Sequence, residues 1–354
     1  MSTSNTEAQR RREAVHTAQQ ELQNLYFGGV ALYSKETIQL IINRLAQYLL
    51  NQPLNSIPIP DIRGNETEVV VFPTYMCQLG GPGNWRKAEA DIIFYSIQEL
   101  LEDTRHRDAS SVYQSISVGY PDAKPCNEYG ELQQYETLPV DDLDTLLETH
   151  RGVWEESEEF WQLKDIITSQ PALAKVDKIV AFACGSLMDP SAAIDPDHMV
   201  QHAMLFSMRT FINEMKEELP SSAGEEVKII LQEPAYTDED KVVLARAGAT
   251  IVESPRAFLD VDERTLVVSI SPNIPVRQIV ADIARPAGMI YYNDKNEWVH
   301  WPNGVMPSLS TDPWSPRVAK MLERYAEIEL PYPRRTRKIV LWARQPAAAA
   351  GGGL

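Results

Sequence analysis

Four short apolar runs in the middle of the chain each end in residues that could bind or transform a substrate. The run Ile179–Cys184 is followed by Gly185 and Ser186, and the run Val227–Leu231 is followed closely by Glu233. A serine hydroxyl at a pocket mouth can act as a nucleophile, and a carboxylate fixed at a strand end can hold a guanidinium. The runs 250–252 and 266–270 are followed by Glu253 and Asn273. We predict Ser186 and Glu233 as catalytic residues, and Gly185, Glu253 and Asn273 as substrate-binding residues.

Both catalytic candidates also have a purely structural interpretation. No Gly-x-Ser-x-Gly elbow surrounds Ser186, so its hydroxyl could instead hydrogen-bond the loop in which it lies. Glu233 could hold the ribose of a nucleotide, bind a cationic substrate group, or be an ordinary carboxylate at a strand end. Cys184 ends its apolar run and is expected to pack rather than react.

The sequence carries no fingerprint of a nucleotide or metal cofactor. The turn at residues 183–187 has one glycine where a dinucleotide-binding motif has three, and no P-loop is present. His198 and His202 have the one-turn spacing of metal ligands on a helix, but a His-Glu-x-x-His motif and a third ligand are missing. We therefore predict neither a cofactor nor a metal site.

The candidate residues are positioned by five predicted strands in alternation with helices. The first strand is apolar without interruption, which is typical of a strand buried on both faces of a parallel sheet. The capping pair Thr237 and Asp240, together with Gly248, marks the start and end of one intervening helix. The fold class is thus α/β, with a Rossmann-like five-stranded parallel sheet, helices on both faces, and a ligand site at the carboxyl ends of the strands. The predicted strands are 179–184, 227–231, 250–252, 266–270 and 289–292.

The rest of the chain is predicted to surround this core. The expected divisions are a polar tail (1–24), an N-terminal α/β region (25–150), the Rossmann-like core (151–295), a C-terminal extension with a basic segment (296–345) and a disordered tail (346–354). The periodicity of Ala88–Arg107 predicts an amphipathic helix, as does that of Arg317–Ile328, and Ile339–Trp342 predicts a further strand.

Composition and charge limit the classes of function. The chain has 354 residues, 44% of them hydrophobic, and a formal net charge of −17, which argues against a surface that is basic all over. Three scattered cysteines give neither a disulfide framework nor a zinc site. Neither a secretory signal nor the run of about 20 apolar residues that spans a bilayer is present, so we expect a cytoplasmic protein without a membrane partner.

The residues of the core resemble the SRR1-like domain family. The resemblance rests on the run from Lys178 to Leu187, on Gln201 in the following helix, and on Glu233-Pro234 and Pro272-Asn273. It covers about residues 150–295, and the segment 312–317 fits fungal members beyond it. This chain departs from the family in having Glu233 where Asp is common, and Asn273 where His is common.

The resemblance implies two different functions. One fungal branch of the family is similar to arginine-containing cyclodipeptide synthases, which join arginine and a second amino acid from aminoacyl-tRNAs into a diketopiperazine, in secondary metabolism. That branch carries an Asp-Asp-x-x-Glu motif, whose nearest match here is the pair Asp141 and Asp142 without the Glu. Other members resemble regulatory or interaction proteins without an established reaction. We favour the synthase and retain the non-catalytic regulator as the alternative.

The synthase interpretation implies further residues and partners. Arginine needs carboxylates, for which Asp141, Asp142 and Glu253 are available beside Glu233, and Gln201 is a further substrate-binding candidate. A tRNA needs cations, which we expect from the basic segment Arg334, Arg335, Arg337 and Lys338. The aminoacyl ester is already activated, so no ATP site is required. A third possibility, a methyltransferase-like enzyme, would use Gly185 and Glu233 to bind S-adenosylmethionine.

Overall fold

The structure is a computed structural model in which the chain forms two compact units. It describes residues 2–51, 56–79, 81, 83–102, 108–121, 123–133, 137–188, 196–218, 225–293, 310–332 and 338–346. The first unit comprises Met1–Gln134, Asn273–Ile283 and Asn296–Ser315, and the second comprises Tyr135–Pro272, Ala284–Lys295 and Pro316–Leu354. Each unit therefore draws on segments that are far apart in the sequence.

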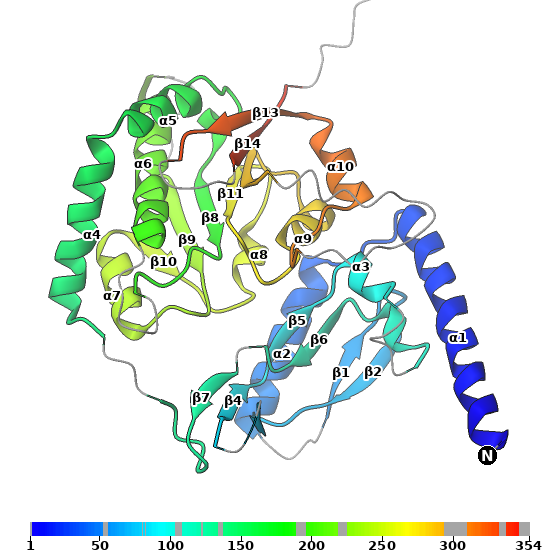
Figure 1. Cartoon of the computed structure of the whole chain (residues 1–354). Helices are drawn as coiled ribbons and strands as arrows, with labels where there is room; N and C mark the ends of the chain where they lie inside the picture. The colour runs from blue at the N-terminus through cyan, green and yellow to red at the C-terminus, as the bar shows by residue number, and fades with distance from the viewer. Residues whose placement is uncertain are drawn as a thin grey trace, which may run out of the picture. The chain divides into compact units, whose positions relative to one another are not determined.

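The second unit is built on a mixed sheet whose order is β10-β9-β8-β11-β12-β14-β13 (Figure 1). Strands β8 to β12 are parallel, whereas β14 pairs antiparallel with both β12 and β13. The five predicted strands are all present, but the sheet has seven strands and not five. Their bounds are β8 (Lys178–Phe182), β9 (Lys228–Gln232), β10 (Ala249–Ile251), β11 (Thr265–Ser269), β12 (Gly288–Tyr292), β13 (Tyr325–Leu330) and β14 (Ile339–Arg344).

Alternate side chains of the central strand β8 pack on opposite faces of the sheet, as the pleat requires. Ile179 and Ala181 belong to the cluster that also contains the buried residues of α6. Phe182 faces the other way and stacks on Phe258 of α8, with 4.5 Å between the ring centroids. Helices thus cover both faces. The helices of this unit are α4 (Val140–Glu155), α5 (Glu158–Thr168), α6 (Pro196–Glu218), α7 (Asp238–Arg246), α8 (Ala257–Asp260) and α10 (Pro316–Leu322), with a 3-10 turn η2 (Leu173–Lys175).

The C-terminal extension differs from its prediction in one element. The predicted helix over Arg317–Ile328 ends at Leu322, and Tyr325–Leu330 forms strand β13 instead. Within β13 the exposed Glu327 and Glu329 alternate with less exposed neighbours, and this period-2 pattern outweighs the helical one once β14 is available as a partner.

The described residues of the first unit form three small antiparallel sheets together with helices. The sheets are β1-β2, β3-β4-β7 and β5-β6. Its strands are β1 (Ser56–Pro60), β2 (Glu66–Val70), β3 (Thr74–Gln78), β4 (Trp85–Glu89), β5 (Asp91–Phe94), β6 (Ile116–Gly119) and β7 (Lys124–Cys126). Its helical elements are α1 (Ser2–Phe27), α2 (Lys35–Asn51), α3 (Ile97–Leu100), the 3-10 turn η1 (Ser111–Tyr113) and α9 (Val276–Ile283).

Helix α9 lies between two strands of the sheet in sequence but belongs to the first unit. Its Asp282 accepts hydrogen bonds from the backbone N–H groups of Leu32 (2.6 Å) and Tyr33 (3.2 Å). Its Arg277 forms a buried ion pair with Asp312, with 2.9 Å from Nε to Oδ2. These contacts explain why the segment after β11 groups with the N-terminal residues.

Three predictions for the N-terminal part require correction. Residues 2–24 form most of helix α1 where a polar tail was expected, because Val15, Ala18 and Leu22 recur at helical spacing and are buried. Residues 88–107 hold β4, β5 and the short α3 where a single helix was expected. The core domain begins before residue 151, since α4 packs in the second unit. Among the described residues no helix combines the length and apolar composition needed to cross a membrane.

Candidate functional site

The turn after β8 holds the first two candidate residues in a constrained conformation. Ala183 and Gly185 both have positive φ, 55° and 74°. The His198 ring lies directly over Gly185, so that a Cβ added there would be 2.4 Å from the imidazole atoms. His198 Nδ1 is also 2.8 Å from the carbonyl oxygen of Ser186. Glycine is therefore required at position 185 both for its backbone conformation and for the close approach of helix α6.

Ser186 is hydrogen-bonded to the buried carboxylate of Asp240, which the sequence indicated only as part of a helix cap. The Ser186 hydroxyl donates to Asp240 Oδ2 over 2.6 Å, and the Leu187 N–H donates to Oδ1 over 3.3 Å. Asp240 is fully buried and also caps α7 by accepting from the Thr237 N–H. Desolvation by burial raises the pKa of Asp240, although the Ser186 hydrogen bond opposes that rise. A hydroxyl within reach of a carboxylate of raised basicity is a recognised nucleophile–base arrangement.

The same geometry also gives Ser186 a structural role. Its residue is only 7% exposed, and its oxygen accepts from the Met188 N–H over 3.2 Å. The loop hydrogen bond that the sequence left open as an alternative is therefore present. The two roles are compatible, because a serine held in one rotamer by its turn is also a serine aimed at one point.

The carboxylate of Glu233 is held by backbone N–H groups from two turns, the one after β8 and the one after β9. Its Oε2 accepts from the Gly185 N–H over 3.0 Å, and its Oε1 accepts from the Ala235 N–H over 2.9 Å. Glu233 thus connects the ends of β8 and β9, and it is only partly buried. A carboxylate has about four acceptor positions, so two remain for a cationic group that approaches from solvent.

A buried imidazole–phenol pair joins α6 to the turn between β9 and α7, and no sequence pattern indicated it. His202 Nε2 is 2.7 Å from the Tyr236 hydroxyl, and its Nδ1 is 2.7 Å from the His198 carbonyl oxygen. Desolvation lowers the pKa of His202 to about 4, so the ring is neutral at pH 7. Both ring nitrogens of His202 are already engaged. Among the described residues no three side chains are grouped so that they could hold a metal ion.

Gln201 Oε1 and Ser269 Oγ are among the buried side-chain atoms that have no hydrogen-bond partner in the described residues. Ser269 is the last residue of β11, which lies beside β8 in the sheet with Ser269 opposite Phe182. The connections leave β8 and β11 toward opposite sides, so this is the switch point at which open α/β sheets bind ligands. Ser271, just beyond, has a positive φ of 63°.

The acidic candidates outside the turn lie elsewhere on the second unit. Asp141 pairs with Arg246 at the end of α7, with 2.8 Å between Oδ1 and Nη1, and Asp142 is exposed beside it. Asp240 lies near the start of α7, six residues before Arg246, so the backbone of Arg246 is roughly 9 Å further along that helix. Glu253 is exposed and 3.7 Å from Lys241 Nζ. The structure thus brings Gly185, Ser186 and Glu233 together, whereas Asp141 lies apart.

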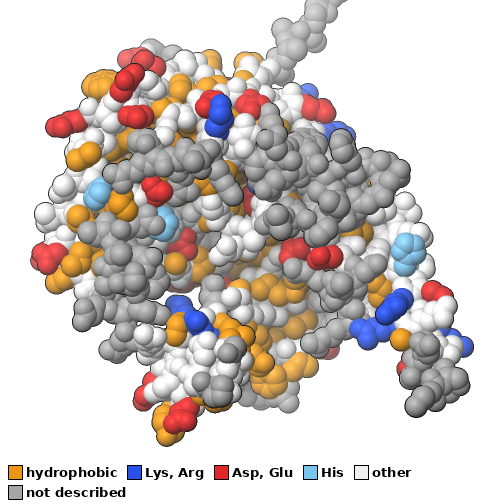
Figure 2. Space-filling view, viewed as in Figure 1, with side chains coloured by type: hydrophobic (Ala, Val, Ile, Leu, Met, Phe, Trp, Pro, Cys, Tyr) orange, Lys and Arg blue, Asp and Glu red, His pale blue; other side chains and the backbone are white. Residues whose placement is uncertain are grey.

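The remaining candidates stay predictions. Asn273 is exposed and belongs to the first unit, while the strand-end turns belong to the second. Arg334, Arg335 and Arg337 lie outside the described residues. Lys338 pairs with Glu329 on the neighbouring strand, 2.7 Å apart. On the face shown in Figure 2, the described Lys and Arg side chains occur in small separate groups and not in one continuous patch.

Comparisons with solved structures give only remote similarity. An O-methyltransferase family protein from Burkholderia thailandensis is 11% identical over 57% of this chain and 59% of that chain, with a TM-score of 0.30. This chain therefore spans less than two thirds of the length of that relative. Cofactor-bound Rv0187 from MTB is 10% identical over 58% of this chain and 91% of that one, with a TM-score of 0.28. No protein with a curated description matches the sequence.

The family comparison covers the part of the chain that contains the strand-end site. The model of the SRR1 domain matches residues 146–304, a range that includes β8 to β12 and the turns that hold Ser186 and Glu233. It supports the resemblance to the SRR1-like family drawn from the sequence. Residues 146–304 of this chain thus match the SRR1 domain.

Proposed function

We propose that this protein is an arginine-containing cyclodipeptide synthase that takes arginine and a second amino acid from aminoacyl-tRNAs. The observation that carries the proposal is the 2.6 Å hydrogen bond from the Ser186 hydroxyl to the buried carboxylate of Asp240. It supplies a nucleophile with a base at the carboxyl end of the central strand. The SRR1 domain at residues 146–304 supports the assignment at the level of the family.

The proposed reaction begins with transfer of the arginyl group to Ser186. The Ser186 oxygen attacks the ester carbonyl of arginyl-tRNA while its proton passes to Asp240. The bond to the tRNA ribose oxygen breaks, and that oxygen leaves with the proton. An arginyl ester of Ser186 and a free tRNA result. Raised basicity of Asp240 favours the proton transfer, because a base works best when its pKa approaches the operating pH.

Two amine attacks then complete the product. The amine of the second aminoacyl-tRNA attacks the Ser186 ester, so that an amide bond forms and Ser186 regains its proton. The arginine amine next attacks the ester that joins the second amino acid to its tRNA. The six-membered ring closes and the second tRNA leaves with its hydroxyl protonated. No oxidant, reductant or ATP enters the sequence, since both ester bonds are already activated.

Glu233 is the residue that we assign to the arginine side chain. Its carboxylate is braced by the N–H groups of Gly185 and Ala235, and it neighbours the turn that contains Ser186. A planar guanidinium pairs best with a carboxylate whose orientation is already fixed. Phosphate contacts of the tRNA are assigned to Arg334, Arg335, Arg337 and Lys338, with Lys338 released from Glu329 on binding.

The test is reconstitution of purified protein with arginyl-tRNA and a panel of other aminoacyl-tRNAs, with mass spectrometry of the products. We expect an arginine-containing diketopiperazine from the native chain and none from Ser186→Ala. Glu233→Gln should reduce arginine use by about ten- to a hundredfold, because a charge-assisted hydrogen bond contributes roughly 1.5–3 kcal/mol. Glu263→Gln is the matched control, since Glu263 is exposed and precedes β11 at the opposite edge of the sheet.

The competing function is that of a non-catalytic SRR1 regulator. It is favoured by the 7% exposure of Ser186 and by the hydrogen bonds that tie this residue to its own turn. If no tRNA combination yields a diketopiperazine from folded protein, the synthase proposal fails and the regulator takes its place.

A further inference from the structure

A cleft opens at the amino edge of the sheet in the second unit, on the side opposite the strand-end turns. It encloses about 680 Å³, which is within the range of small-molecule sites. Its walls come from the segment before β8, from the turn between α10 and β13, and from the end of β14. The lining residues are Pro171, Ala172, Lys175, Glu323, Arg324, Arg344, Gln345 and Pro346.

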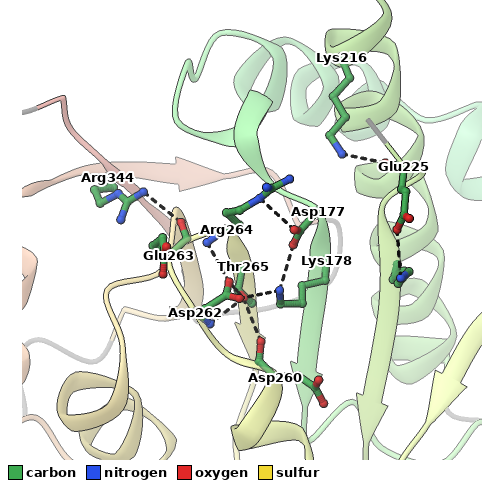
Figure 3. A network of polar contacts seen from close by, with 11 residues as sticks. Asp177, Lys178, Lys216, Glu225, Asp260, Asp262, Glu263, Arg264, Thr265 and Arg344 are labelled. Atoms are coloured by element: carbon green, nitrogen blue, oxygen red, sulfur yellow. Dashed lines mark hydrogen bonds and ion pairs between the residues drawn. The ribbon is translucent and has the colours of Figure 1, made fainter. Parts of the chain in front are cut away.

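Two cations along this edge, Lys178 and Arg264, are neutralised by carboxylates. Figure 3 shows Lys178 between Asp177 and Asp262, at 3.1 and 2.8 Å. Arg264 pairs with the second oxygen of Asp177 at 2.9 Å. These contacts form a closed network of two cations and two anions, so they leave no net charge to attract a ligand.

The cations that line the cleft are not paired with carboxylates of the described residues. Arg344 donates to two backbone carbonyls, those of Arg285 (2.7 Å) and Glu263 (3.0 Å; Figure 3), and to no carboxylate of the described residues. These bonds hold the guanidinium in place and leave its charge uncompensated. Lys175 and Arg324 likewise have no ion-pair partner within the described part of the chain, and both are exposed.

Charge and shape together define the ligand. Lys175, Arg324 and Arg344 against one lining carboxylate, Glu323, leave a local charge of +2 on a protein whose net charge is −17. A phosphate monoester carries about −1.5 to −2 at pH 7. Arginine binds phosphate through a planar fork and also stacks on flat rings. The apolar residues Pro171, Ala172 and Pro346 offer a surface for the remainder of such a ligand.

We propose that this cleft is a binding site for a nucleoside mono- or diphosphate. The phosphate contacts Lys175, Arg324 and Arg344, and the base lies against the proline-lined wall. The site is separate from the strand-end turns and does not depend on the proposed synthase activity.

Titration calorimetry of the full chain with AMP, ADP and inorganic phosphate tests the proposal. We expect saturable binding of a nucleotide that is tighter than binding of phosphate alone. Arg324→Gln and Lys175→Gln should each weaken it by about tenfold, the effect of losing one charge-assisted contact that is partly open to solvent. Lys228→Gln is the matched control, because Lys228 begins β9 at the same edge and pairs with Glu225 outside the cleft.

Two results would overturn the proposal. One is the absence of saturable nucleotide binding at millimolar concentration, and the other is equal weakening by Lys228→Gln. A labelled RNA oligonucleotide provides a third arm: RNA binding that Arg324→Gln abolishes, without mononucleotide binding, would assign the cleft to a polynucleotide and refute the small-ligand site. If a Gln variant fails to fold, Arg324→Lys and Lys175→Arg keep the charge and should retain most of the affinity.

Discussion

The two edges of the central sheet use polar residues in opposite ways. At the carboxyl edge, Ser186, Glu233 and Asp240 are held by short bonds to backbone groups and to one another, and Asp240 is fully buried. At the amino edge, Lys178, Asp177 and Asp262 form ion pairs that are partly open to solvent. Buried, oriented groups are expensive to disrupt, whereas screened surface pairs contribute little. The difference indicates that the carboxyl edge is where the fold maintains a fixed geometry.

Removal of Asp240 should have the largest effect. Asp240→Ala leaves the Ser186 hydroxyl and the Leu187 N–H without their acceptor and removes the cap of α7. A lost cap costs about 1 kcal/mol and each of the two buried unsatisfied groups about 1–3 kcal/mol, so we expect a loss of about 3–7 kcal/mol in the free energy of unfolding. Urea unfolding measures it. Asp238→Ala in the same turn of α7, whose side chain is 97% exposed, should cost less than about 1 kcal/mol. Equal losses for the two variants would refute this structural role of Asp240.

The buried His202 should make the carboxyl edge sensitive to acid. Its pKa falls from 6.5 in the unfolded chain to about 4 in the fold, so between these values the unfolded state binds more protons. Its contribution to stability is therefore complete above pH 6.5 and lost as the pH falls toward 4, by about 3 kcal/mol. The measurement is the free energy of unfolding at several pH values in the native chain and in His202→Gln.

The expected result is a flatter pH profile in His202→Gln over that interval. The raised pKa of Asp240 acts in the opposite direction, because the folded state then holds the proton longer, and stability falls as the pH rises from 3.8 through the folded value. A native profile with the same slope as His202→Gln would contradict the burial of a neutral imidazole.

A pair of glycine substitutions separates steric contact from backbone strain. Gly185→Ala should destabilise more than Gly64→Ala, although both residues have positive φ, 74° and 85°. An added Cβ at Gly185 meets the His198 ring at 2.4 Å, whereas at Gly64 nothing lies within 4 Å. The shared backbone cost is about 1–2 kcal/mol, and overpacking adds about 1–3 kcal/mol at Gly185 alone. Thermal unfolding compares the two, and His198→Ala should recover part of the difference.

The smallest effect is expected at the amino edge. Lys178→Met removes both ion pairs of Lys178 but keeps its stem, so the free energy of unfolding should fall by no more than about 1 kcal/mol. High salt should reduce the difference in the free energy of unfolding between Lys178→Met and the native chain, since partly exposed ion pairs are screened. A loss as large as that of Asp240→Ala would remove the contrast between the two edges.

The sequence was sufficient to predict the five parallel strands of the sheet because these strands carry a simple signal. β8 is apolar throughout, and the Thr237–Asp240 capping box and the positive φ of Gly248 are present as expected. Glu233 and Ser186 follow from the same rule, since parallel strands bring their carboxyl ends to one edge. Strand β13 was missed because its period-2 pattern overlaps the helical spacing of Arg317–Ile328, and pairing with β14 decides between the two.

The partners of the site could not be predicted, because they depend on contacts distant in sequence. Asp240 was recognised as a cap, but no local pattern indicates that Ser186, 54 positions earlier, donates to it. His202 and Tyr236 come together only when α6 packs on β9. The spacing of His198 and His202 is that of metal ligands, but in the fold His202 is engaged in a buried hydrogen bond with Tyr236. The expected helix at Ala88–Arg107 failed for a related reason, since its apolar residues pack in two short antiparallel pairs.

The membership of α9 in the first unit also determines how the chain can be divided experimentally. The SRR1 match starts at residue 146 and ends at 304. A fragment with those limits would lack β13 and β14, and also Leu32, Tyr33 and Asp312, which bind Asp282 and Arg277 of α9. Val276, Ile279 and Val280 are fully buried in the intact protein and belong to the same compact unit as the N-terminal residues. The limits of the family match are thus not the limits of a compact unit, and we expect that a fragment of residues 146–304 does not fold as a self-contained module.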